Sequence, residues 1–263
     1  MPRRARADTT ARRALIVLLW VCSNAATALA LEPEPPDPLH SPSWSVMRER
    51  FFKAAPIVFD DRVRVTAPEH AENPLSVPVR VDADGLDGVR EILIIADLNP
   101  IQKILSLQPT RAAPGLAFRF KIEQSTPVRA AMRTGDGVWH LGGRWISAAG
   151  GGCTAPSGGS RGLWQGHLGE MNARLWPRDA GAAQRLRLRV VHPMDTGLAN
   201  GIPAFYIDRL VVRDAGGEEL AAISIFEPVA ENPVLSLDLR NRGPVRIDGH
   251  DIQGNTFSAE IAP

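Results

Sequence analysis

Residues 116–122 read Leu-Ala-Phe-Arg-Phe-Lys-Ile, a stretch in which large apolar side chains occupy every second position. The four apolar residues fall on one face of an extended chain, whereas Arg119, Lys121 and Glu123 fall on the other. This period of two predicts a half-buried antiparallel strand whose polar face is turned toward solvent.

Strands of the same kind recur on both sides of this stretch. The first series covers residues 62–66, 75–81, 91–98, 101–107, 116–122, 128–133 and 138–147. Turn-forming pairs such as Asp84-Gly85 and Pro114-Gly115 separate its members. About seven short strands without alternating helices predict an immunoglobulin-like β-sandwich over residues 56–148.

A second series of strands follows residue 168. It covers residues 173–176, 185–192, 204–213, 220–226, 234–239, 244–251 and 255–261. These strands predict a second, smaller sandwich over residues 169–263. The expected fold class is therefore all-β, with two immunoglobulin-like β-sandwich domains joined by a glycine-rich, cysteine-bearing loop over residues 149–168.

The N-terminus has the layout of a secretory signal peptide over residues 1–30. Five arginines accompany the apolar run 14–21, and a small-x-small motif, Ala28-Leu29-Ala30, follows. We expect cleavage near Ala30 and a periplasmic location, by the general route or by the twin-arginine route that Arg12-Arg13 suggests. The apolar run is too short to span a bilayer, so we expect no membrane span after cleavage.

Residues 31–55 lie between the signal and the first sandwich. Five prolines in residues 31–42 predict an extended leader. Large apolar side chains near helical spacing in residues 43–53 then predict a short amphipathic helix that packs onto the core, with Ser43 as its N-cap.

The charge balance excludes one class of partner. The first 30 residues hold five arginines and one aspartate, so their removal changes the net charge from +1 to −3. No basic patch for nucleic acid is indicated.

The segment from Ala148 to Gly159 reads Ala-Ala-Gly-Gly-Gly-Cys-Thr-Ala-Pro-Ser-Gly-Gly. Its glycines, which are Gly150, Gly151, Gly152, Gly158 and Gly159, predict flexibility and leave little apolar surface to bury. The chain has two cysteines, and Cys22 lies in the signal, so Cys153 alone remains after export. It is then either an inert buried residue or a free thiol for intermolecular chemistry, and flanks without an apolar anchor favour the free thiol.

Other catalytic or metal-binding patterns are weak in this sequence. The six histidines are scattered, so we expect no metal site and no cofactor. His192-Pro-Met194 is either a copper-binding pair or a turn with Met194 packed inside, and we favour the turn. There is no nucleophile elbow, phosphate loop or C-x-x-C motif. No base adjoins the thiol in sequence, although His140 or His167 could approach it in the fold.

Two blocks of the sequence resemble known families. The block from Val63 to Cys153, a sandwich that ends in Gly-Gly-Cys, resembles SoxY, the substrate-carrying subunit of the periplasmic thiosulfate-oxidising Sox system. The block from Arg185 onward, with Arg189-Val-Val-His-Pro-Met-Asp-Thr-Gly197 and Phe226-Glu-Pro-Val-Ala-Glu-Asn-Pro233, resembles its partner SoxZ. Their order in one chain is similar to that of the SoxYZ-like carriers named for their association with quinoprotein dehydrogenases.

The resemblance implies that Cys153 corresponds to the cysteine on which SoxY carries covalently attached sulfur intermediates. It also implies that the second sandwich packs against the first. Partners would be periplasmic redox enzymes, whether a quinoprotein dehydrogenase, a cytochrome c or Sox-type enzymes. Here another domain follows Cys153, so the loop is tethered at both ends.

Our leading hypothesis is a non-enzymatic carrier that holds a small group on Cys153 and presents it to partner enzymes. An alternative is an accessory protein that docks onto a dehydrogenase or cytochrome, with Cys153 incidental. A third is a disulfide-linked homodimer through Cys153, since one thiol permits a dimer and no larger covalent oligomer. An enzyme in its own right is the weakest option.

Overall fold

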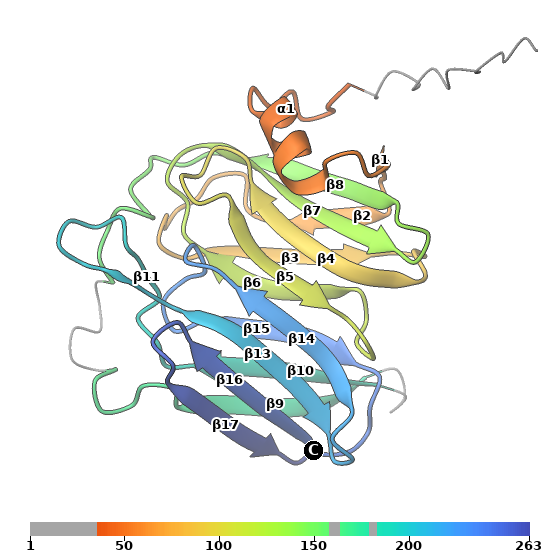
Figure 1. Cartoon of the computed structure of the whole chain (residues 1–263), viewed down its shortest axis with the longest axis vertical. Helices are drawn as coiled ribbons and strands as arrows, with labels where there is room; N and C mark the ends of the chain where they lie inside the picture. Colours follow the sequence, from red (N-terminus) through yellow and green to blue (C-terminus); the bar gives the residue numbers. More distant parts are fainter. Residues whose placement is uncertain (1–35, 158–163, 179–182) are drawn as a thin grey trace, which may run out of the picture. The chain divides into compact units, whose positions relative to one another are not determined.

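The computed structural model describes residues 36–157, 164–178 and 183–263, whose regular secondary structure is mostly β-strand (Figure 1). The strands are β1 (Ile57–Phe59), β2 (Val63–Thr66), β3 (Val77–Ala83), β4 (Val89–Ala96), β5 (Lys103–Gln108), β6 (Gly115–Phe120), β7 (Thr126–Thr134), β8 (Trp139–Ile146), β9 (Met171–Arg178), β10 (Ala183–Val190), β11 (Asp195–Thr196), β12 (Ala204–Phe205), β13 (Ile207–Asp214), β14 (Glu219–Ile225), β15 (Val234–Leu239), β16 (Val245–Asp251) and β17 (Thr256–Ile261). The signal predicted for residues 1–30 lies outside the described residues. In the described part of the chain, no helix is long and apolar enough to cross a membrane.

The expected all-β sandwich architecture is confirmed, with β1–β8 forming an N-terminal half and β9–β17 a C-terminal half. Both halves share two sheets. Sheet A has nine strands in the order β1-β8-β7-β4-β5-β14-β13-β16-β17, and sheet B has six in the order β2-β3-β6-β15-β10-β9. The apolar side chains between the sheets form one core cluster that contains residues of both halves.

The seam between the halves is made of strand pairing, which the sequence did not predict. In sheet A, β5 pairs with β14 in antiparallel register from Leu105–Ile225 to Gln108–Ala222 (Figure 1). In sheet B, β6 pairs with β15 through Ala117 and Ser236. Each half thereby satisfies backbone groups that would otherwise lie at an open sheet edge of the other.

In residues 116–122, the prediction of a half-buried strand is confirmed for the apolar face only. Its four apolar side chains are at most 3% exposed and face the core. Lys121, however, is 2% exposed, so the expectation of a solvated position for it is wrong. Its ammonium group donates to the carbonyl oxygen of Met194, because the loop after β10 covers this end of the strand.

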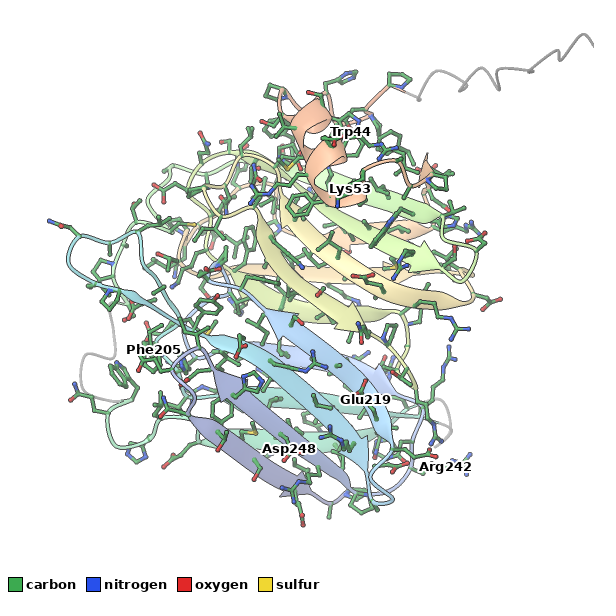
Figure 2. The ribbon with its side chains drawn as sticks, viewed as in Figure 1. Trp44, Lys53, Phe205, Glu219, Arg242 and Asp248 are labelled. Atoms are coloured by element: carbon green, nitrogen blue, oxygen red, sulfur yellow. The ribbon has the colours of Figure 1, made fainter. Side chains whose placement is uncertain are left out.

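The predicted helix is present as one α-helical turn, α1 (Trp44–Met47), followed by a π-helical turn, η1 (Arg48–Phe52). Met47 and Phe52 pack against the outer face of sheet A, which confirms the expected packing; Trp44 and Lys53 mark the ends of the segment in Figure 2. Ser43 is the N-cap residue, as expected, and its carbonyl oxygen accepts the amide of Met47 at 3.0 Å, but its side chain makes no capping hydrogen bond.

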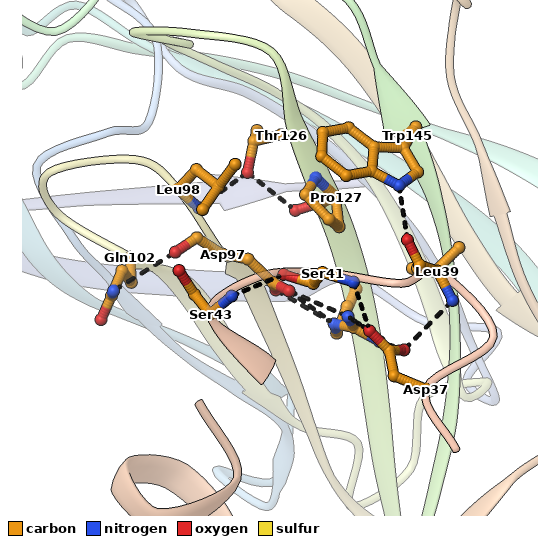
Figure 3. Close-up of polar contacts among 11 residues, drawn as sticks. Asp37, Leu39, Ser41, Ser43, Asp97, Leu98, Gln102, Thr126, Pro127 and Trp145 are labelled. Atoms are coloured by element: carbon orange, nitrogen blue, oxygen red, sulfur yellow. Dashed lines mark hydrogen bonds and ion pairs between the residues drawn. The ribbon is translucent and has the colours of Figure 1, made fainter. Parts of the chain in front are cut away.

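A buried ion triplet ties the leader to sheet A. Arg129 on β7 is 1% exposed and donates to both Asp37 oxygens at 2.8 Å and to Asp97 at 2.9–3.0 Å. Burial opposes ionisation of Asp37, but hydrogen bonds from Arg129 and from the Ser41 amide hold the pKa of Asp37 below its ordinary value. Figure 3 shows Asp37 and Asp97 converging between the leader and the sheet.

Candidate functional site

The residues around Cys153, which we call the cysteine segment (residues 148–157), lie against the end of β6. The amide of Gly151 donates to the carbonyl oxygen of Glu123 at 3.2 Å, and the amide of Gly152 donates to that of Ile122 at 3.0 Å. Gly150 and Gly151 adopt φ angles of 106° and 84°, which other residues rarely adopt. These glycines therefore serve a docked backbone in this structure, beyond the flexibility expected of them. Gly158 and Gly159 lie outside the described residues.

Gly152 is required by close approach. A Cβ atom there would lie 2.5 Å from the carbonyl oxygen of Ile122 and closer still to that of Pro74. The Pro74 oxygen already accepts the amide of Ile122 at 2.8 Å, so both obstacles belong to hydrogen-bonded backbone.

The thiol of Cys153 is buried, with 0% of the residue exposed. It donates to the carbonyl oxygen of Lys121 at 3.5 Å, and its sulfur accepts from the side-chain amide of Asn99 at 3.7 Å. The expectation of a free, unanchored thiol is wrong, because the groups that hold Cys153 come from the β4–β5 turn and from the end of β6. The glycines that flank Cys153 only allow its backbone to come close to these groups.

A single carboxylate fastens the backbone on either side of the thiol. Glu123 Oε2 accepts the amides of Cys153 at 2.9 Å and Thr154 at 3.1 Å, and its Oε1 accepts the Thr154 hydroxyl at 3.0 Å. Three donors on one carboxylate make this the main polar clamp on the segment.

The C-terminal half completes the binding of the segment. The hydroxyl of Thr196 donates to the carbonyl oxygen of Cys153 at 2.6 Å. Asp195 accepts the amide of Ser157 at 3.0 Å and its hydroxyl at 3.2 Å. Cys153 is therefore enclosed by groups from both halves of the molecule.

The docked thiol is chemically quiet. Burial, together with the nearby Glu123 carboxylate, raises the pKa of Cys153 to about 12, and Lys121 offsets part of that shift. The thiolate is the nucleophilic form, so at neutral pH the docked cysteine is almost wholly protonated and unreactive. Any covalent chemistry at this sulfur requires the cysteine segment to leave its site.

The loop that covers Lys121 contains the His192-Pro-Met194 motif. Met194 is fully buried with φ 52°, and its sulfur accepts the amide of Ile207 at 3.4 Å, which confirms that Met194 packs inside. No group of three or more potential metal-binding side chains occurs among the described residues. His140 and His167 bind Asp60 at 2.8 Å and Glu170 at 2.6 Å, so the structure places neither as a partner of the thiol.

His192 is a buried neutral histidine in this loop. Its Nδ1 accepts the Met194 amide at 3.1 Å, its Nε2 lies 3.5 Å from the Asp251 carboxylate, and its ring centroid lies 4.5 Å from that of Phe205. Burial lowers its pKa to about 4, against the opposite effects of the Asp251 and Asp195 carboxylates.

This burial predicts a specific loss of stability in acid. Unfolded His192 takes up a proton below about pH 6.5, whereas folded His192 does not until about pH 4. The free energy of unfolding should therefore be unaffected above pH 6.5 and fall by about 3 kcal/mol between pH 6.5 and 4 through this residue. Urea titrations should show a flatter acid limb for His192→Asn. If the free energy of unfolding of wild type and of His192→Asn fell equally steeply between pH 6.5 and 4, His192 would not be the cause of the acid loss.

Sequence reasoning found the cysteine but missed the residues that hold it. Asn99, Lys121 and Glu123 carry no motif. Asp195 and Thr196, by contrast, belong to the His-Pro-Met-Asp-Thr-Gly stretch, whose resemblance to a partner subunit was the available signal.

Comparison with known proteins gives two family matches. Residues 48–153 match the model described as Sulfur oxidation protein SoxY, and residues 175–262 match Sulphur oxidation protein SoxZ. A solved structure of the sulfur carrier protein SoxY from Chlorobium limicola f thiosulfatophilum is 23% identical, with a TM-score of 0.36, and the match covers 41% of this chain and 96% of that one. A search of curated proteins gave no match.

Proposed function

This chain belongs to the SoxY and SoxZ families, whose domains it carries in tandem, and from that premise we propose that it holds sulfur covalently on Cys153. Membership supports a sulfur-carrier role in partnership with Sox sulfur-oxidation enzymes, and not a catalytic one. The position of Cys153 supports it as the residue that holds sulfur. Cys153 is the last residue of the SoxY match and lies in a docked segment that both halves hold.

Loading follows release of the cysteine segment. Once Cys153 leaves its site, its pKa falls toward the ordinary value and the thiolate forms. The thiolate attacks the outer sulfur of a donor persulfide, R–S–SH, so that a new S–S bond forms on Cys153. The old S–S bond breaks and the donor departs as the thiolate R–S⁻, a step that needs no external oxidant. When Cys153 carries no sulfur, its return to the docked site shields the free thiol from oxidants.

We place this carrier in the periplasm, exported by the N-terminal signal and cleaved near Ala30. A quinoprotein dehydrogenase or a cytochrome c is the further partner that the fused domain order suggests. A disulfide-linked homodimer is compatible with one thiol, but it too requires release, because Cys153 is fully buried when docked.

The test is the intact mass of protein isolated from its native host without reductant. We expect an adduct of about 32 Da or a multiple of it, the mass of bound sulfur atoms, that a reducing thiol removes and that Cys153→Ser lacks. A free thiol as the sole species, with unchanged growth of a Cys153→Ser host on sulfur compounds and alcohols, would contradict the proposal.

The same burial favours a second candidate, in which the cysteine is purely structural. Buried cysteines in a docked position are commonly inert. The protein would then act as a non-covalent accessory or docking protein of a periplasmic quinoprotein dehydrogenase or cytochrome, with Cys153 incidental. Under this candidate a Cys153→Ser host behaves as wild type, while deletion of the whole gene impairs growth.

A further inference from the structure

The outer face of sheet B contains a groove of about 880 Å³ at the seam between the two halves. Its floor is made of small residues where β6 meets β15, namely Gly115, Ala117 and Ser236. The outward positions on the flanking strands carry longer side chains, so the seam is a shallow valley that crosses from one half to the other.

The walls of this seam groove are strongly basic. Among the described residues, five arginines and two aspartates line it, with no lysine or glutamate; the charged residues are Arg80, Arg119, Arg178, Arg185, Arg187, Asp82 and Asp238. The groove thus has an excess of three positive charges, whereas the net charge of the whole chain is +1. Apart from these seven residues, the chain therefore has a net negative charge.

The aspartates neutralise only part of this charge. Arg80 pairs with Asp82 at 3.2 Å, and Arg185 binds Asp238 with two hydrogen bonds of 2.7 and 2.8 Å. Arg187 has no ion-pair partner within the described part of the chain.

Within the described residues, the side chain of Arg119 donates to one group, the backbone oxygen of Ser76, at 3.3 Å. Arg187 and Arg119 stand on β10 and β6, on opposite sides of the seam, and both are exposed. Each offers unused guanidinium N–H groups in the planar fork that binds carboxylates.

An exposed aromatic side chain stands at the rim. Trp176 on β9 is 40% exposed, lines the groove and lies opposite Arg185 in the β9–β10 register. Tryptophan and arginine are the residues that dominate binding energy at protein–protein interfaces. An open groove with both fits a protein surface better than a small ligand, which prefers an enclosed cavity.

The groove leads toward Cys153 along one strand. Arg119 is two residues before Lys121, whose carbonyl oxygen accepts the thiol, and two residues further on Glu123 clamps the cysteine segment. A protein bound in the groove would therefore lie beside the segment when it is released.

We propose that the seam groove is the docking surface for the acidic face of a partner protein that loads or unloads Cys153. That the partner loads or unloads Cys153 rests on the function proposed above. Carboxylates of the partner pair with Arg119 and Arg187, and Trp176 packs at the edge of the contact. The excess positive charge also accelerates the encounter by steering an acidic surface to this face.

The direct test is fluorescence anisotropy with a labelled peptide of alternating glutamate and serine, and a lysine–serine peptide as its counterpart. We expect the purified protein to bind the acidic peptide only, with affinity that falls as salt rises. The double variant Arg119→Glu/Arg187→Glu should weaken binding by about tenfold or more, and Arg187→Ala by a smaller factor. Arg90→Glu, an exposed arginine on sheet A, is the matched control and should bind as wild type.

Three results would overturn the proposal. One is equal binding by wild type and Arg119→Glu/Arg187→Glu, and another is an equal loss in Arg90→Glu. The third is preference for a different ligand, seen as selective displacement by sulfate over chloride at matched ionic strength or as tighter binding of a single-stranded oligonucleotide.

The peptide carries no sulfur, so its affinity reports only on binding in the groove. The intact mass of Arg119→Glu/Arg187→Glu isolated from the host reports only on the loading of Cys153, and we expect a smaller fraction of adduct than in Arg90→Glu. Failure of docking is thereby distinguished from failure of the carrier function, which would remove the adduct from the wild type as well.

Discussion

Alanine in place of Gly152 is expected to release Cys153 and to accelerate its alkylation by iodoacetamide about a thousandfold at neutral pH. The added Cβ would overlap two backbone carbonyl oxygens, those of Pro74 and Ile122, neither of which can yield without breaking hydrogen bonds. The segment must then leave its site. The pKa of Cys153 falls from about 12 to its ordinary value near 9, and three pKa units correspond to a thousandfold more thiolate.

The pH profile of alkylation separates this effect from simple unfolding. The rate for wild type should climb up to about pH 12, whereas the rate for Gly152→Ala should level off near pH 9, with the far-ultraviolet circular dichroism unchanged. Gly166→Ala is the matched control, since a Cβ there meets no atom within 4 Å. Wild-type reactivity in Gly152→Ala would mean that the thiol is not protected by docking.

Arg129→Met is expected to lower the free energy of unfolding by about 3–5 kcal/mol at pH 7, because it leaves two buried carboxylates without their shared cation. Arg129 is 1% exposed, and Asp37 and Asp97 are 9% and 1% exposed. Methionine fills similar volume, so the loss measures the ion triplet more than a cavity. Urea denaturation followed by tryptophan fluorescence measures the difference.

The pH dependence of the Arg129→Met deficit provides a second check. The pKa of Asp37 is lowered in the folded protein, so its contribution is present above the unfolded pKa of about 3.8 and is lost as the pH falls through the lower folded value. The deficit should be largest at neutral pH and shrink in acid. Arg133→Met, on the same strand but paired with Glu91 at the surface, should cost no more than about 1 kcal/mol. Similar deficits for both variants would contradict the role of the triplet.

Strand positions could be predicted from the sequence because side-chain alternation is a local property. The stretch around Phe118 and the strand 185–192 both alternate clearly, and both are strands in the structure. The pairing of β5 with β14 could not be predicted, since it joins segments more than a hundred residues apart and each strand could equally have been an edge.

The candidate site shows the same division. Cys153 was identifiable because it is the single cysteine after the predicted signal and sits among glycines. Its burial was not, because the enclosing groups come from distant segments: Asn99 from a turn, Glu123 from a strand end and Thr196 from the other half. Lys121 was wrongly predicted to face solvent for the same reason, since side-chain alternation along a strand takes no account of a loop that folds over it.

The seam between β5 and β14 has a consequence for concentration dependence. Two separate subunits joined by such an edge would dissociate on dilution, and each would then expose an unpaired strand. A covalent link replaces that bimolecular equilibrium with an intramolecular one, which does not depend on the protein concentration. The enclosure of Cys153, which needs Glu123 from one half and Thr196 from the other, therefore persists however dilute the protein becomes.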